Sequence, residues 1–176
     1  MIEPYLRQSA LDHLGLAARS SASPGDAPGD AGVTLAEKTM PAAVNLRGDA
    51  GDPAFVEAVR SALGAVPPTE PNTVAPGDDL ALLWLGPDEW LAVRHAATPG
   101  AEAELAAKLR GALADFHAAV TEVGESLCCI AVAGPRARDL VAKGCPLDLH
   151  PRAFGGVGHC AQSHLAKAAI TLHQTA

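Results

Sequence analysis

Aromatic residues are scarce in this chain, which has three Phe, two Trp and one Tyr among 176 residues. Alanine, leucine and valine must therefore fill any core, and the large side chains that usually shape a small-molecule pocket are few. Positive charge is also in short supply, because 13 Lys and Arg stand against 20 Asp and Glu and leave a net charge of −7. That balance argues against a surface that tracks the phosphates of a nucleic acid.

Long hydrophobic runs are absent as well. No window approaches the roughly 18 uninterrupted apolar residues of a membrane span, and residues 1–4 lack the basic head of a signal peptide. We therefore expect a cytoplasmic chain with no membrane partner and with four reduced cysteines. The mean hydropathy of +0.13 is nevertheless high for a protein that works alone.

The first 42 residues carry two different signals. Residues 6–18 have the apolar spacing of a short amphipathic helix, with Ser9 as a candidate cap. Residues 20–32 are mainly Ser, Pro, Gly, Asp and Ala, a composition that cannot offset its ordering entropy. We therefore divide the chain into three parts: an N-terminal segment at 1–19 that could dock as a helix, a flexible linker at 20–42 and a single domain at 43–176.

Proline and glycine mark three helices in that domain. The helices open at Asp52-Pro53, Thr98-Pro99 and Gly134-Pro135, and the first and third close at Gly64 and Gly144. Proline suits the first helical position because its missing N–H would be unpaired there, and glycine tolerates the left-handed residue that ends a helix. The apolar residues expected to face inward are Phe55, Val59 and Leu63 in the first helix, and Leu105, Leu109, Leu113 and Phe116 in the second.

Apolar segments between these helices predict strands. Two hairpins are expected, around turns at 86–89 and 124–126, and Trp84 would face Trp90 across the first. Residues 161–173 fit either two more strands or one helix. This order of elements predicts an α+β fold with helices packed on one face of an antiparallel sheet. The strands expected in the two hairpins are 80–85, 90–94, 120–123 and 127–132.

Five side chains of the types that bind zinc fall within twenty residues near the C-terminus. Zinc sites take sulfur and imidazole ligands, but no close pair of these residues has the spacing that nucleates a ribbon, knuckle or finger. We expect no metal here and keep a zinc site as a hypothesis to be tested. The five residues are Cys145, His150, His159, Cys160 and His164.

Other patterns that carry chemistry are weak. The segment 156–161 fits G-x-G-x-x-A, but no buried strand precedes it and no acid follows at the required distance. The segment 124–128 lacks the second glycine of a nucleophile elbow. Cys145 at a helix end indicates a small structural residue, and Cys128 and Cys129 are expected in a strand as small hydrophobes on opposite faces. The residues alone therefore indicate no catalytic, cofactor-binding or metal site.

Six stretches of the chain form a distinctive set: 9–15, Asn45-Leu46-Arg47-Gly48, 68–73, 83–91, Gly134 to Phe154, and Cys160-Ala161-Gln162. Together they resemble the gamma subunit of heterotetrameric sarcosine oxidase. The start of the fifth stretch, Gly134 to Arg138, is shared with the wider aminomethyltransferase-like superfamily, whereas the combination is specific. The resemblance covers residues 45–174 and the short opening stretch.

The resemblance implies a fold like the folate-binding domain of the aminomethyltransferases. It also implies a structural subunit that has no catalytic, cofactor-binding or metal-binding residues. In that family the complex oxidatively demethylates sarcosine to glycine and hydrogen peroxide, and it forms 5,10-methylenetetrahydrofolate when tetrahydrofolate is present. FAD, FMN, NAD and zinc belong to the partners, which are the alpha, beta and delta subunits. The high mean hydropathy then fits a surface that other subunits cover.

One alternative stays open within the same superfamily. Lys143-Gly144-Cys145 is similar to a Lys-Gly-Cys signature of folate-binding relatives, which would make the chain a stand-alone tetrahydrofolate-binding protein. The next residues, Pro146-Leu147-Asp148, depart from that signature. The chain also departs from the subunit family at Glu122-Val123-Gly124 and in ending at Ala176, before a further strand and helix. We expect a sheet edge there that a partner would cover.

Overall fold

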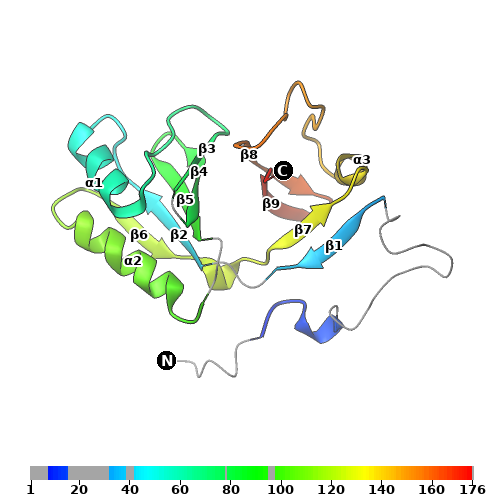
Figure 1. The fold of residues 1–176 in the computed structure, drawn as a ribbon, viewed down its shortest axis with the longest axis horizontal. Helices are drawn as coiled ribbons and strands as arrows, with labels where there is room; N and C mark the ends of the chain where they lie inside the picture. The colour runs from blue at the N-terminus through cyan, green and yellow to red at the C-terminus, as the bar shows by residue number, and fades with distance from the viewer. Residues whose placement is uncertain (1–7, 16–31, 39–41, 78, 95–97, 176) are drawn as a thin grey trace.

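The computed structural model describes residues 8–15, 32–38, 42–77, 79–94 and 98–175. Figure 1 shows two halves, which we call the sheet half (β2 to β6 with α1 and α2) and the ribbon half (β1, β7, β8, β9 and α3). The elements in chain order are the 3-10 turn η2 (Asp12–Leu14), β1 (Thr34–Glu37), β2 (Ala42–Arg47), α1 (Pro53–Leu63), β3 (Val74–Pro76), β4 (Leu80–Gly86), β5 (Glu89–Arg94), α2 (Ala101–Ala112), β6 (Ala119–Glu122), the 3-10 turn η4 (Gly124–Ser126), β7 (Ile130–Ala133), α3 (Ala137–Ala142), β8 (Cys160–Leu165) and β9 (Ala168–His173).

The sheet half is built on a five-stranded antiparallel sheet in the order β3-β4-β5-β2-β6. Helices α1 and α2 lie on one face of this sheet (Figure 1), so the predicted α+β architecture is confirmed. Because side chains alternate along a strand, Leu80 and Leu82 of β4 point to the helices and Leu83 points away. Trp90 is fully buried beneath the helices and pairs in register with Trp84, as predicted.

Helix α1 follows its sequence signals closely. Asp52 caps it, since its carboxylate oxygen Oδ1 accepts a hydrogen bond of 2.9 Å from the backbone N–H of Ala54. Pro53 takes the first helical position, and Gly64 ends the helix with a left-handed φ of 68°. The predicted inward face is buried, and Phe55 packs with its ring centroid 6.0 Å from that of Trp90.

The other two helices begin later than predicted. Helix α2 starts at Ala101 because Gly100 has a φ of 85°, which no right-handed helix contains. Helix α3 starts at Ala137, after a turn in which the Ala137 N–H donates to the Gly134 carbonyl. The prolines therefore lie in the turns that lead into these helices and not at the first helical position.

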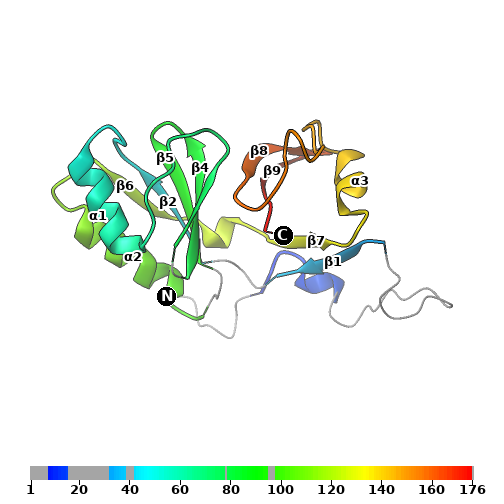
Figure 2. The same cartoon turned by 45° about the horizontal axis from the view of Figure 1, so that its top comes forward.

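The second face of the five-stranded sheet joins the two halves. Leu83 and Leu91 pack there against Cys160 of β8. Backbone bonds accompany this packing, because the Val74 N–H donates to the Gly158 carbonyl and the Cys160 N–H donates to the Asn72 carbonyl. Residues 161–173 are thus two strands and not one helix, and Figure 2 shows the resulting β8–β9 hairpin between the sheet and α3.

Three predictions about local structure need correction. Within 6–18, the described residues 8–15 hold only the turn η2, which ends at Gly15 with a φ of 58°; the rest of that predicted helix lies outside the described residues. The hairpin predicted around 124–126 is wrong, because β6 pairs with β2 whereas the second strand begins only at Ile130, after η4, and pairs with β1. Strand β1 falls inside the predicted linker 20–42, where it pairs with β7. The division at residues 19 and 42 stays a prediction.

Candidate functional site

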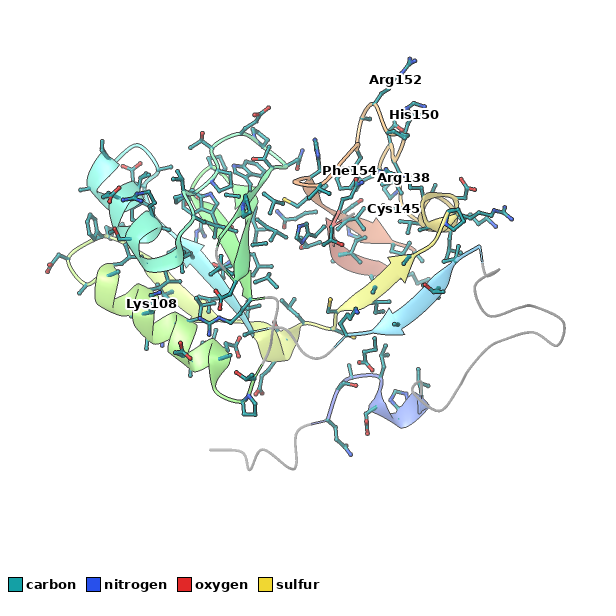
Figure 3. The ribbon with its side chains drawn as sticks, in the orientation of Figure 1. Lys108, Arg138, Cys145, His150, Arg152 and Phe154 are labelled. Carbon is teal, nitrogen blue, oxygen red and sulfur yellow. The ribbon has the colours of Figure 1, made fainter. Side chains whose placement is uncertain are left out.

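The segment between α3 and β8 holds most of the candidate residues, and Arg138 organises it. The Arg138 Nη1 atom donates to the carbonyl oxygens of Leu149 at 2.7 Å and of Phe154 at 2.6 Å. Figure 3 shows Arg138 reaching from α3 towards Phe154 beneath this loop. Hydrogen bonds from a charged donor are stronger than neutral ones, so one side chain fixes both ends of the 149–154 turn. The role of Arg138 is therefore structural: it holds this loop in place.

The tip of the same segment carries two exposed polar side chains, one of them the guanidinium of Arg152. His150 and Arg152 lie at this tip, away from the body of the protein (Figure 3). The Nδ1 atom of His150 accepts a hydrogen bond of 3.1 Å from the Arg152 N–H, and the Asp148 carboxylate accepts one from the His150 N–H. These bonds close local turns, and they use one ring nitrogen of His150.

The five residues proposed as zinc ligands do not converge. Cys145 belongs to an apolar cluster with Phe154 in the ribbon half, whereas Cys160 lies in the cluster against the sheet half. The His159 Nδ1 atom is 3.3 Å from the carbonyl oxygen of its near neighbour Gly156. Within the described ranges, no group of three or more His, Cys, Asp or Glu residues is placed to hold a metal ion. The zinc hypothesis is therefore wrong for these five residues.

Two of the cysteines have a raised pKa, which disfavours their thiolate form. Burial raises the pKa of the Cys160 thiol, which donates to the carbonyl oxygens of Thr73 and Trp84 at 3.4 Å each. The pKa of Cys128 is also raised, first by burial and then by the Glu37 carboxylate, whose Oε1 atom lies 3.6 Å from the sulfur. Cys128 and Cys129 are exposed and precede β7, so the prediction that they lie within a strand is wrong. A raised pKa weakens both Cys160 and Cys128 as nucleophiles at neutral pH.

The glycine-rich segment 156–161 has the wrong surroundings for a dinucleotide site. It leads into strand β8, whereas a dinucleotide site needs a helix N-terminus at that point. The Gly158 carbonyl accepts a hydrogen bond from Val74 of β3, so the segment ties the two halves together. Its glycines are explained by backbone conformation, because Gly156 has a φ of 119° and Gly158 a φ of 97°.

A surface patch that the sequence analysis did not predict lies at the end of α3. The Ala166 N–H, in the β8–β9 turn, donates to the Gly144 carbonyl at 2.8 Å. This bond joins the residue that follows Lys143 to the residue that precedes Lys167, and both lysines are exposed, as are Leu140 at 39% and Leu165 at 38%. We call this the α3 patch; its residues are Leu140, Lys143, Leu165 and Lys167. A charge count by segment would have indicated a basic end of the chain but not the patch itself, since residues 130–175 contain five Lys and Arg against two Asp and Glu and only two of the five are in the patch.

Comparison with known proteins decides the family. A sequence model described as "Sarcosine oxidase, gamma subunit family" matches residues 47–176. The chain belongs to this family. The resemblance found in the sequence is thereby confirmed, and the wider match includes the loop that Arg138 fixes.

Individual members of the gamma subunit family match over most of the chain. The chain is 36% identical over 151 residues to the sarcosine oxidase subunit gamma of Corynebacterium sp. (strain P-1), which covers 85% of this chain and 68% of that relative. It is 33% identical over 171 residues to the subunit gamma of an Arthrobacter species, covering 97% and 78%.

A solved structure matches the whole arrangement. It is a heterotetrameric sarcosine oxidase from Corynebacterium sp. U-96 in complex with pyrrole 2-carboxylate, and one of its chains superposes with a TM-score of 0.80. The sequence identity is 30%, and the match covers 97% of this chain and 83% of that chain. None of the helices in the described part of the present chain is long and apolar enough to cross a membrane.

Proposed function

We propose that this chain is the gamma subunit of a heterotetrameric sarcosine oxidase in the cytoplasm, with a structural role in the complex. One observation carries the proposal: 97% of the chain superposes on a chain of a heterotetrameric sarcosine oxidase with a TM-score of 0.80 and 30% identity. The family assignment over residues 47–176 supports the same subunit role.

In this proposal the partners of the chain are the alpha, beta and delta subunits. The complex oxidatively demethylates sarcosine to glycine and hydrogen peroxide, and it forms 5,10-methylenetetrahydrofolate when tetrahydrofolate is present. FAD, FMN, NAD and zinc are held by the partner subunits. The chain itself contributes no catalytic, cofactor-binding or metal-binding residue.

The side chains of the described residues support a structural role. Three side chains that could carry chemistry make contacts within the fold: Arg138 donates to two carbonyl oxygens, Cys160 donates to two others, and His150 accepts a hydrogen bond within its own turn. Among residues of the described ranges, none of the buried residues is polar or charged. Active sites usually hold desolvated titratable groups whose pKa values suit the reaction, so this distribution favours a scaffold.

Co-expression tests the proposal. The chain is produced with the alpha, beta and delta subunits, the complex is captured through a tag on alpha, and sarcosine-dependent peroxide is measured. We expect the chain in the captured complex, and we expect less intact complex when it is left out. A chain that stays a stable monomer and is never captured would contradict the proposal. Calorimetric binding of tetrahydrofolate to the chain alone would instead support the stand-alone folate-binding alternative.

A further inference from the structure

Charge is strongly segregated along this chain. Residues 42–129, which contain the sheet half, have 13 Asp and Glu against five Lys and Arg. Residues 130–175, which contain most of the ribbon half, have two Asp and Glu against five Lys and Arg. A chain with an overall charge of −7 therefore has a basic end.

The cations of the two halves differ in how they are paired. Four of the five in the sheet half form ion pairs: Arg47 with Asp88 at 2.7 Å, Arg60 with Glu57 at 2.6 Å, Arg94 with Asp79 at 2.8 Å and Arg110 with Glu122 at 3.0 Å. In the ribbon half, Arg136 contacts Asp139 at 3.5 Å. No carboxylate of the described residues pairs with Lys143, Arg152 or Lys167.

Two of these three residues, Lys143 and Lys167, belong to the α3 patch, which also contains two exposed leucines. The 2.8 Å bond between the Ala166 N–H and the Gly144 carbonyl joins the sequence neighbours of Lys143 and Lys167. Leu165 lies against Gly144, since a Cβ added at that glycine would meet its Cδ1 atom at 3.2 Å. Single exposed leucines are ordinary on a protein surface. Here two exposed leucines and two exposed lysines that no carboxylate of the described residues pairs lie on adjoining segments, which gives this surface the apolar and charged groups that the centre and rim of an interface require.

We propose that the α3 patch binds a partner subunit of the complex. The surface of that partner at the contact has an apolar centre and an acidic rim. This inference rests on the proposed function. A nucleic acid or an anionic membrane fits less well, because the acidic sheet half would repel a large polyanion. A second copy of this chain would have to bind the α3 patch through its acidic sheet half. Such a contact joins two different surfaces, and it produces an open filament unless the rotation between copies closes a ring.

Charge reversal in the complete complex tests the docking. Lys143→Glu and Lys167→Glu are combined in the chain and co-expressed with the alpha, beta and delta subunits. We expect the captured complex to retain about tenfold less of the variant chain than of the wild-type chain, because two attractive charge pairs at the rim of the contact become repulsive. The control is Lys108→Glu on α2, an exposed lysine of the sheet half (Figure 3), for which retention should stay at the wild-type level. Lys143→Arg with Lys167→Arg keeps the charge and should also be retained.

The salt dependence of binding tests the same proposal on the wild-type chain, without any variant. Retention of the wild-type chain should fall between about 50 mM and about 500 mM NaCl, since exposed charges are screened over a few ångströms at high salt. If the reversed variant failed to fold, as judged by circular dichroism, this dependence would decide: retention that does not change with salt would overturn the proposal.

The remaining outcomes separate the two proposals. A folded double-reversal variant that is retained like the wild type overturns the docking site and leaves the subunit role intact. A wild-type chain that is not retained refutes the proposed function itself. If the reversal abolishes oligomers of the chain alone but leaves the complex unchanged, the occupant is a second copy, and the proposal of a partner subunit is wrong.

Discussion

Arg138 illustrates at the residue scale what the sequence could and could not show. The stretch from Gly134 to Arg138 carries part of the family resemblance, but the sequence gives Arg138 no role. In the structure its Nη1 atom bonds the carbonyls of Leu149 and Phe154, residues 11 and 16 positions away. Contacts at that range depend on how the loop closes, which no local pattern predicts. Likewise, the five candidate zinc ligands are close in sequence but not in space.

Replacing Arg138 should loosen the loop. Arg138→Ala removes two charge-assisted hydrogen bonds to carbonyls that are partly shielded from water, so we expect a loss of about 2 kcal/mol in the free energy of unfolding, measured with urea. The control is Arg136→Ala, two residues earlier, whose exposed pair with Asp139 should contribute little. An equal loss in the free energy of unfolding for the two variants would contradict the role of Arg138 in holding the loop.

Thiol labelling tests the assigned environments of the cysteines. In the native chain, Cys128 and Cys129 should react with a thiol reagent, while Cys145 and Cys160 should react only after unfolding. Because the pKa of Cys128 is raised by burial and by Glu37, its thiolate fraction is small at neutral pH and grows as the pH rises.

Glu37→Gln removes the carboxylate beside that thiol. It should shift the pH profile for labelling of Cys128 to lower pH and raise the rate at pH 7, as followed by mass spectrometry. Lys38→Gln is the control at the neighbouring position and should not shift the profile downwards. An unchanged profile for Glu37→Gln would show that the carboxylate does not influence the thiol.

At the scale of elements, the sequence predicted the helices and strands that have strong local signals and missed the strands that depend on long-range pairing. Helix α1 and the β4–β5 hairpin were predicted because their caps, turns and apolar faces are encoded in neighbouring residues. Strand β1 was missed because it is short, largely exposed and pairs with β7, almost one hundred residues away. Strand β2 was also missed, although it is central, because it pairs with β5 and β6 and has no hairpin turn of its own beside it.

The cap of α1 can be tested directly. Asp52→Ala removes the side-chain acceptor of the Ala54 N–H, and we expect the free energy of unfolding to fall by about 1 kcal/mol. Asp52→Asn keeps an acceptor oxygen and should lose much less. Thermal unfolding followed by circular dichroism measures both variants. A loss for Asp52→Asn as large as that for Asp52→Ala would mean that the cap is not the source of the effect.

At the scale of the whole molecule, exposed apolar side chains are the structural counterpart of the high mean hydropathy. Large apolar side chains remain exposed in the ribbon half, including Leu35 at 64%, Ile130 at 53% and Val157 at 71%. In an obligate subunit, surface of this kind is covered by the partners, because obligate interfaces resemble a domain core cut in half. The scarcity of aromatic residues fits a chain that supports an enzyme whose cofactors, in our proposal, lie in other subunits.

The most direct test of this account is the mass of the assembled particle. The alpha, beta and delta subunits are expressed with and without this chain, and the particle mass is measured by size-exclusion chromatography with light scattering. The account predicts a single particle that is heavier by 17.9 kDa for each copy of the chain. A particle of unchanged mass, with the chain eluting separately as a stable monomer, would contradict it.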